Sequence, residues 1–210
     1  MTPIDHNFAY RNITISGLPG SGSTTLLNKL REELKYDGWT GFSGGDFMRA
    51  YALEQGLFKP KAGIHHAATD YSDDFDREVD LGMRKKLQSE DHWILEAWLS
   101  GFFAQQIPGV LKVLMICSSD AVRVDRIVNR DKVTPDEAVA HIHKRYSDNL
   151  AKWTRMYGKE WQEYVVEPGT VPADEPIDFW RPELYDVVVD TYSSNQQESL
   201  QTILDAIKKT

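Results

Sequence analysis

The fold is decided by residues 12–25, which read NITISGLPGSGSTT. The apolar run over residues 12–16 predicts a strand, and the glycine-rich turn leads into a helix expected from about Gly22 to Tyr36. Glycines let the backbone wrap closely around phosphate oxygens, and the N–H groups at the start of a helix supply positive potential. A strand, a glycine-rich turn and a helix in this order are the context of a phosphate-binding loop.

The predicted loop would bind phosphate through backbone N–H groups and hydroxyls. We expect these contacts from Gly17, Pro19, Gly20, Ser21, Gly22, Ser23, Thr24 and Thr25. Thr24 stands where such loops place a hydroxyl on Mg²⁺. Ser23 stands where the pattern has a lysine, so a charge-assisted contact worth about 1.5–3 kcal/mol is missing. The alternative interpretation is a Gly/Ser turn that only caps an ordinary helix.

Apolar runs alternate with helical patterns along the rest of the chain. Further strands are expected at residues 39–43, 93–96, 110–117 and 186–190, and further helices at 46–55, 74–88, 118–130, 134–157 and near the C-terminus. Strands that alternate with helices are typical of a parallel sheet. We therefore expect a single α/β domain over residues 1–210, with a five-stranded parallel sheet and helices on both faces.

Two segments lack a clear period. Residues 59–73 look like a connection, and residues 159–183 form a proline-rich insertion that we interpret as a long ordered loop, so the preceding helix should stop at Gly158. The aromatic side chains of the insertion would cover an active site, make a subunit contact or simply pack on the core. They are Trp161, Tyr164, Phe179 and Trp180.

Composition excludes several classes of protein. The net charge of −8 argues against a protein that coats a nucleic acid polymer. The lone Cys117 excludes a disulfide framework, and six Trp, nine Tyr and eight Phe exclude disorder of the whole chain. No apolar run is long enough for a membrane span and the N-terminus lacks the apolar core of a secretory signal, so we expect a cytoplasmic protein with no membrane partner.

Three arginines follow the fourth expected strand at helical spacing. Arg123, Arg126 and Arg130 are three and four residues apart, so a helix places their guanidinium groups on one face. Like charges at this spacing repel, and an anionic partner would explain them, because planar guanidinium groups suit phosphate oxygens. The alternative is a solvated basic face that nearby acids neutralise.

The order of these motifs resembles that of cytidylate kinase-like P-loop proteins, and in particular an archaeal-type branch without a lysine in the loop. The matching segments are Gly45–Arg49, Asp76–Asp80, Ile94–Glu96, Asp125–Arg130, Arg145, Tyr157–Gly158 and Tyr185–Thr191. The resemblance covers nearly the whole chain except about residues 159–183. It implies a P-loop kinase fold with a helical lid at about 126–145, and transfer of the γ-phosphoryl group of ATP to CMP, dCMP or a similar nucleoside monophosphate, with Mg²⁺ as cofactor.

The resemblance also implies roles for single residues. The catalytic set would be Arg49, Arg126, Arg130, Arg145 and Asp46. The acceptor would be bound by Arg49, Asp76, Arg77, Asp80 and Asp148. Mg²⁺ would be held by Thr24 and, through water, by Asp46.

The chain departs from the family pattern at Glu96-Ala97-Trp98, where the family has Glu-Gly-Arg. That arginine helps to hold the monophosphate, and Trp98 cannot. Together with Ser23 and the insertion, Trp98 leaves two alternatives open. The chain would be a nucleotide-binding protein with weak catalysis, acting as a sensor or partner-binding module, or a P-loop kinase for another small acceptor. The oligomeric state is left open.

Overall fold

The computed structural model describes residues 8–54 and 71–208 of the 210-residue chain. Its centre is one parallel sheet with the strand order β2-β3-β1-β4-β5. The strands are β1 (Asn12–Gly17), β2 (Thr40–Ser43), β3 (Trp93–Glu96), β4 (Val110–Ile116) and β5 (Val187–Asp190). The prediction of an α/β fold with a five-stranded parallel sheet is confirmed.

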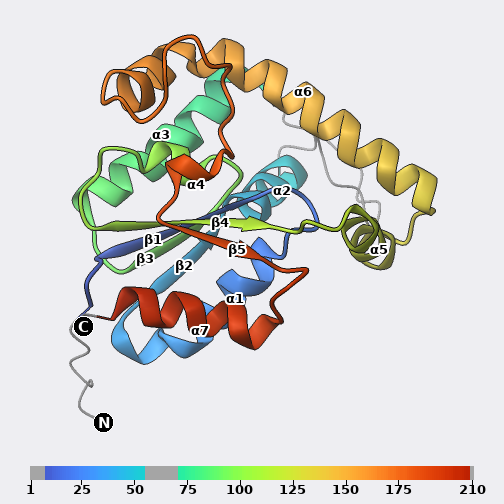
Figure 1. Cartoon of the computed structure of the whole chain (residues 1–210), viewed down its shortest axis with the longest axis horizontal. Coiled ribbons are helices and arrows are strands. Elements are labelled where there is room, and N and C mark those ends of the chain that lie inside the picture. Colours follow the sequence, from blue (N-terminus) through green and yellow to red (C-terminus); the bar gives the residue numbers. More distant parts are fainter. Residues whose placement is uncertain (1–7, 55–70, 209–210) are drawn as a thin grey trace.

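Helices cover both faces of this sheet (Figure 1). One face carries α1 (Ser23–Glu33) and α7 (Gln196–Ile207), and the other carries α3 (Asp73–Ser89), α4 (Ser100–Phe103) and α6 (Pro135–Trp161). The remaining helices, α2 (Gly44–Glu54) and α5 (Asp120–Asp131), follow β2 and β4. Among the described residues, no helix is long and apolar enough to cross a membrane.

Three apolar clusters hold the helices to the sheet, and the smallest packs Met83 and Leu87 of α3 against Leu95 of β3. On the side of α1 and α7, the β1 residues Ile13 and Ile15 pack with Leu30 and Ile203, and all four side chains are fully buried. On the other side, an aromatic cluster joins α4 and α6 to the sheet. Because both faces of the sheet are covered, its central strand β1 is buried along its whole length.

The proline-rich insertion belongs to the aromatic cluster. Trp161, Tyr164, Phe179 and Trp180 are all buried in it. The indole N–H of Trp180 donates to the backbone oxygen of Trp98 at 2.9 Å. Of the three interpretations of these side chains, the structure shows packing on the core.

The end of α6 differs from the prediction. The helix does not stop at Gly158: the backbone kinks at Tyr157 (φ −115°, ψ 18°), continues to Trp161 and passes into a π-helix, η3 (Gln162–Val166). A glycine costs a helix only about 1 kcal/mol, whereas burying one large apolar side chain contributes roughly 1.5–3 kcal/mol. Burial of Trp161 therefore outweighs the helix-breaking signal at Gly158. Of the predicted connection at 59–73, residues 59–70 lie outside the described residues.

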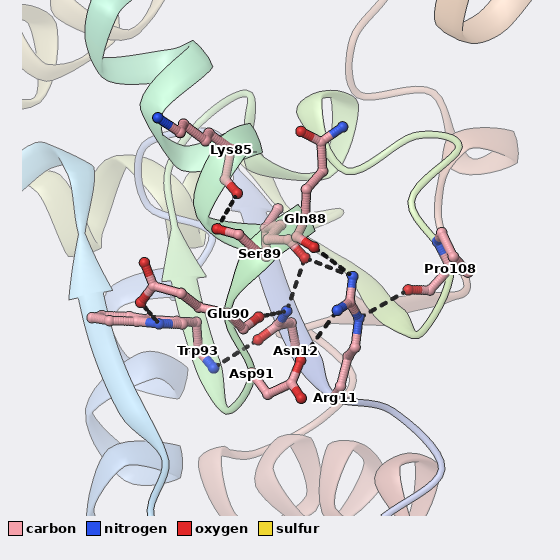
Figure 2. A network of polar contacts seen from close by, with 10 residues as sticks. Arg11, Asn12, Lys85, Gln88, Ser89, Glu90, Asp91, Trp93 and Pro108 are labelled. Carbon is pink, nitrogen blue, oxygen red and sulfur yellow. Dashed lines mark hydrogen bonds and ion pairs between the residues drawn. The ribbon is translucent and has the colours of Figure 1, made fainter.

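A polar network fastens the C-terminus of α3 to the sheet (Figure 2). The Asn12 side chain donates to the backbone oxygens of Leu87 and Glu90 at 3.2 and 2.8 Å and accepts from the Trp93 amide at 2.8 Å. Arg11 also donates to the Leu87 oxygen at 2.9 Å. These bonds satisfy carbonyl groups that a helix end leaves without partners. They fix α3 against the N-terminal ends of β1 and β3.

Candidate active site

The glycine-rich loop connects the end of β1 to the start of α1. Its residues Gly20 and Gly22 have φ angles of 83° and 92°, in the left-handed region that side chains rarely adopt. A Cβ atom on Gly20 would also lie 3.1 Å from the backbone oxygen of Arg123. Glycine is therefore required where the loop turns against α5, as the sequence predicts for a phosphate-binding loop.

Glu96 at the end of β3 ties this loop to its neighbours. The hydroxyls of Ser23 and Ser43 donate to its two carboxylate oxygens at 2.8 and 2.9 Å, and the Thr24 hydroxyl lies 3.4 Å from the first. Burial raises the pKa of Glu96, against the lowering effect of the hydroxyl donors, and the nearby charge of Asp46 raises it further. The serine that replaces the loop lysine is thus attached to the end of β3.

Glu96 is a site residue that is absent from the set predicted from the sequence. A signal was available, because an acid ends the apolar run Ile94-Leu95 and the carboxyl ends of parallel strands meet at one edge of the sheet. In the structure, β3 pairs directly with β1, so Glu96 lies beside the start of the loop.

A cavity of about 760 Å³ opens over the loop. It is lined by loop residues 17–20 and 22–25, by the ends of β2 and β3, and by side chains of α3, α5 and α6. Of the predicted loop contacts only Ser21 does not line it, and that residue is 2% exposed. The loop and the helices that carry the predicted acceptor residues therefore line the same cavity.

Two predicted arginines reach this cavity from α5. Arg126 donates through Nη1 to the Gly20 oxygen at 2.9 Å and to the Thr191 hydroxyl at 2.7 Å. Arg130 bonds both carboxylate oxygens of Asp131, at 2.7 and 2.9 Å, and its side chain remains 43% exposed. The two arginines thus differ: Arg126 is engaged by the loop itself, and Arg130 stands at the solvent-exposed side.

Two acids of α3 also line the cavity: Asp76, which is buried, and Asp80, which is half-buried. Asp76 is 4% exposed and forms a 2.8 Å ion pair with the buried ammonium group of Lys152. Asp80 accepts a 2.6 Å hydrogen bond from the Tyr157 hydroxyl. Burial raises the pKa of Asp76 in spite of Lys152, and it raises that of Asp80 to about 7. These carboxyl groups are placed to bind hydroxyl or amino groups of a ligand.

Helix α6 presents one face to the cavity. Arg145, Asn149 and Trp153, spaced by four residues, all line it. Arg145 lies over the ring of Trp98, 5.2 Å from its centroid, and Trp98 packs edge-on against Trp153 at 5.5 Å. Asn149, which is 2% exposed, was missed by the sequence analysis. An aromatic and amide surface therefore stands where the family pattern has an arginine.

The structure does not bring Arg77 and Asp148 into the cavity. The Arg77 guanidinium forms an ion pair with Glu160 and donates to the Met156 oxygen at 3.2 Å, so it is directed at α6. Asp148 accepts a 2.5 Å bond from Lys144 on another face of α6. Neither residue lines the cavity with Asp76 and Asp80, and binding of the acceptor by Arg77 and Asp148 stays a prediction.

Two further predicted residues belong to α2. Asp46 lies exposed in the first turn of α2, where its amide donates to the Ser43 hydroxyl at 3.3 Å, and it borders the cavity without lining it. The Arg49 side chain lies outside the described part of the chain.

The oxygen atoms around the loop suit a magnesium ion. Thr24 and Glu96 line the cavity and Asp46 adjoins it, which supplies hydroxyl and carboxylate oxygens, the ligands that Mg²⁺ prefers. Within the described ranges, no cluster of three or more His, Cys, Asp or Glu side chains is placed to hold a metal by itself. Magnesium commonly takes one or two protein carboxylates and completes its shell with water and substrate phosphates, so the donor set fits an ion that arrives with a nucleotide.

Comparison with known proteins places the chain among kinases. A family model described as an AAA domain matches residues 13–145. Cytidylate kinases from Methanosarcina acetivorans and Methanosarcina barkeri are 29% and 30% identical over 196 residues, which is 93% of this chain and 95% of each relative.

Solved structures share the fold at low identity. An uncharacterised protein from Eubacterium ventriosum superposes with a TM-score of 0.61 at 13% identity, covering 93% of this chain and 96% of the other. A gluconokinase from Sinorhizobium meliloti superposes with a TM-score of 0.51 at 15% identity, covering 93% and 90%.

Proposed function

This chain belongs to the cytidylate kinase family, and from that membership we propose that it transfers the γ-phosphoryl group of ATP to CMP, dCMP or a closely similar acceptor. It is an ATP-dependent phosphotransferase of the nucleoside monophosphate kinase type. The observation that carries the choice of reaction is that the phosphate loop and the α3 acids Asp76 and Asp80 line the same cavity. Both substrates would meet there without crossing solvent.

The donor end binds the phosphates of ATP through the loop. The N–H groups of the loop and of the first turn of α1 surround the β-phosphate, and Arg130 and Arg145 add positive charge that the loop itself lacks. Thr24 would hold Mg²⁺ through its hydroxyl, and Asp46 would do so through water. When bound, the ion neutralises charge on the phosphates. Ser23 takes no part in charge neutralisation, because its hydroxyl is directed at Glu96.

The acceptor end orients the monophosphate for attack. Asp76 and Asp80 bind the polar groups of the sugar, and Asn149 lies where an amide can pair with the edge of a base. Arg49, with Arg145, holds the acceptor phosphate. We leave Arg77 and Asp148 out of this proposal, because their side chains are bonded to α6 residues outside the cavity.

The transfer itself requires alignment more than chemistry from the protein. An oxygen of the acceptor phosphate forms a bond to the γ-phosphorus, while the bond from that phosphorus to the bridging oxygen breaks and ADP leaves with the electron pair. The segment at about 126–145, which spans the end of α5 and the start of α6, acts as the lid. Its closure excludes water, which otherwise competes with the acceptor.

A second candidate keeps the reaction and changes the acceptor. The observation that favours it is the aromatic surface of Trp98 and Trp153, which lines the cavity where the family has an arginine for the monophosphate. An acceptor with a larger ring system than cytosine would bury more apolar area on this surface.

The test is a coupled assay of ADP release with ATP and a panel of acceptors. The panel contains CMP, dCMP, UMP, AMP and GMP, each at several concentrations. We expect the highest kcat/KM with CMP or dCMP and little ADP release without an acceptor. A clear preference for another member of the panel would support the second candidate, and no turnover with any acceptor would refute the kinase proposal.

A further inference from the structure

Three consecutive carbonyl groups of the phosphate loop, at residues 19–21, are bonded from outside the loop. Arg123 donates through Nε to the first at 3.4 Å, and Arg126 donates through Nη1 to the second at 2.9 Å. The hydroxyl of Thr191 lies 3.0 Å from the third. The loop is therefore held by α5 on one side and by the residue that follows β5 on the other.

Arg126 and Thr191 also hold each other. The Thr191 hydroxyl accepts from Nη1 of Arg126 at 2.7 Å, and the Thr191 backbone oxygen accepts from Nη2 at 2.9 Å. The hydroxyl has one proton to donate, and its acceptors are the Ser21 and Ile116 oxygens at 3.0 and 3.1 Å. The planar guanidinium is thereby fixed in direction, because three of its bonds end on protein groups.

The direction of the loop amides follows from these bonds. In a trans peptide the C=O and the next N–H point in opposite directions. When the carbonyls of residues 19 and 21 are held toward α5 and Thr191, the N–H groups of Gly20 and Gly22 are turned the other way. Both glycines line the cavity. The amide of Ser21, between them, donates to the Leu18 oxygen at 3.0 Å and closes the turn.

We propose that Arg126 and Thr191 are positioning residues that hold the loop in its phosphate-binding conformation. We refer to this pair as the loop clamp. It gives the loop a fixed shape in a chain whose Ser23 supplies no charge to the phosphates and is directed away at Glu96. The inference rests on the proposed function, because it concerns how the same loop binds the triphosphate of ATP.

The loop clamp makes a different prediction from direct contact of Arg126 with the transferred phosphoryl group. If Arg126 acts by its charge, loss of the Thr191 hydroxyl has little effect on nucleotide affinity. If the pair positions the loop, loss of that hydroxyl weakens binding of any polyphosphate, with or without a base. The affinity for the acceptor is then unchanged.

The test compares Thr191→Val, which has nearly the same shape without the hydroxyl, with Thr191→Ser, which keeps it. Thr202→Val is the matched control, because the Thr202 hydroxyl donates to the Glu198 oxygen at 2.9 Å on the exposed side of α7. Calorimetry measures the Kd of ATP and of inorganic tripolyphosphate for each variant, and steady-state kinetics separates KM from kcat.

We expect Thr191→Val to weaken both polyphosphates about 10-fold, as loss of about two hydrogen bonds implies. The KM of ATP rises in step and the KM of the acceptor is unchanged. Thr191→Ser stays within about 2-fold of wild type, and Thr202→Val equals it. Hydrogen exchange without nucleotide gives a second measurement, in which residues 18–26 exchange faster in Thr191→Val.

Equal affinities and equal loop exchange in Thr191→Val and wild type would overturn the loop clamp while wild-type turnover upheld the proposed function. A wild-type protein that binds neither ATP nor tripolyphosphate would instead contradict the proposed function itself.

Discussion

Glu96 is the residue on which the most contacts of the loop converge. Its carboxylate accepts from Ser23 and Ser43, which belong to the start of α1 and the end of β2. Hydrogen bonds to a charged, buried acceptor contribute about 1.5–3 kcal/mol, more than bonds between neutral groups. The carboxylate therefore sets the relative position of the donor loop and of α2.

Replacing Glu96 by glutamine tests this role. The amide keeps the shape but turns one acceptor oxygen into a donor that faces a hydroxyl. We expect kcat/KM for ATP to fall about 10- to 100-fold, the equivalent of about one charge-assisted bond.

Glu90→Gln is the control, because Glu90 pairs with Lys86 on the surface near the opposite edge of the sheet. Steady-state kinetics that gave equal kcat/KM for Glu96→Gln and Glu90→Gln would contradict the role assigned to Glu96.

Asp80 makes the stability of the protein depend on pH. Burial raises its pKa to about 7 in the folded chain, against about 3.9 when unfolded. Between these values the folded state binds the additional proton, so this group makes the free energy of unfolding decrease as the pH rises from about 4 to 7.

The Asp80→Asn variant removes this contribution. Urea unfolding at pH 5 and pH 7.5 should show a smaller loss of stability toward high pH in Asp80→Asn than in the wild type. The same pH dependence in both proteins would mean that Asp80 titrates at its ordinary pKa.

For single residues, the sequence predicts the placement correctly where local backbone conformation determines it. It does not where a partner far away in the chain determines it. The left-handed φ angles of the loop could be predicted, because the glycines that adopt them are visible in the local sequence. The local sequence around Arg77 cannot predict its ion pair with Glu160, which lies 83 residues further along the chain. In this ion pair the guanidinium is directed away from the cavity. Arg126 reaches the cavity as predicted, but its partner Thr191 is 65 residues away.

At the scale of elements, the bounds of strands and helices could be predicted from the local sequence pattern. The face that a long helix turns toward the cavity could not. The predicted strand 93–96 and helix 74–88 match β3 and α3 to within one residue at each end. Along α6, Asp148 and Asn149 are neighbours, and only the second lines the cavity. Each residue turns a helix by about 100°, so a sequence pattern that leaves the buried face undetermined cannot choose between them.

The polar network at the C-terminus of α3 lies far from the cavity, so it should contribute to the stability of the fold and not to activity. Asn12 is fully buried and its side chain makes three hydrogen bonds (Figure 2). In Asn12→Ala the Glu90 oxygen and the Trp93 amide lose this partner, while the Leu87 oxygen keeps its bond from Arg11, and we expect a loss of about 2–3 kcal/mol in the free energy of unfolding.

Chemical denaturation measures this loss, and kcat/KM at a permissive temperature should be nearly unchanged because the cavity lies at the other end of β1. Ser89→Ala removes a single exposed bond to the Lys85 oxygen in the same network and serves as the control. Equal stability of the two variants would show that the Asn12 bonds contribute nothing beyond surface contacts.

At the scale of the whole molecule, the parallel topology of the sheet determines where the candidate active site lies. The carboxyl ends of β1, β2 and β3 carry the loop, Ser43 and Glu96, and they meet at one edge of the sheet because all pairings are parallel. Helices α3 and α6, which lie on the face of the sheet opposite α1 and α7, complete the cavity over this edge. In the proposed reaction the donor and the acceptor nucleotide occupy this one cavity together.

The most direct measurement of that claim is the affinity of a bisubstrate compound, adenosine linked to cytidine by five phosphates, determined by calorimetry beside ATP and CMP. Linking two ligands that bind side by side strengthens binding by about 10²–10⁴. We expect the linked compound to bind at least about 100-fold more tightly than ATP, and CMP to compete with it. An affinity no higher than that of ATP, with no competition by CMP, would contradict a shared cavity.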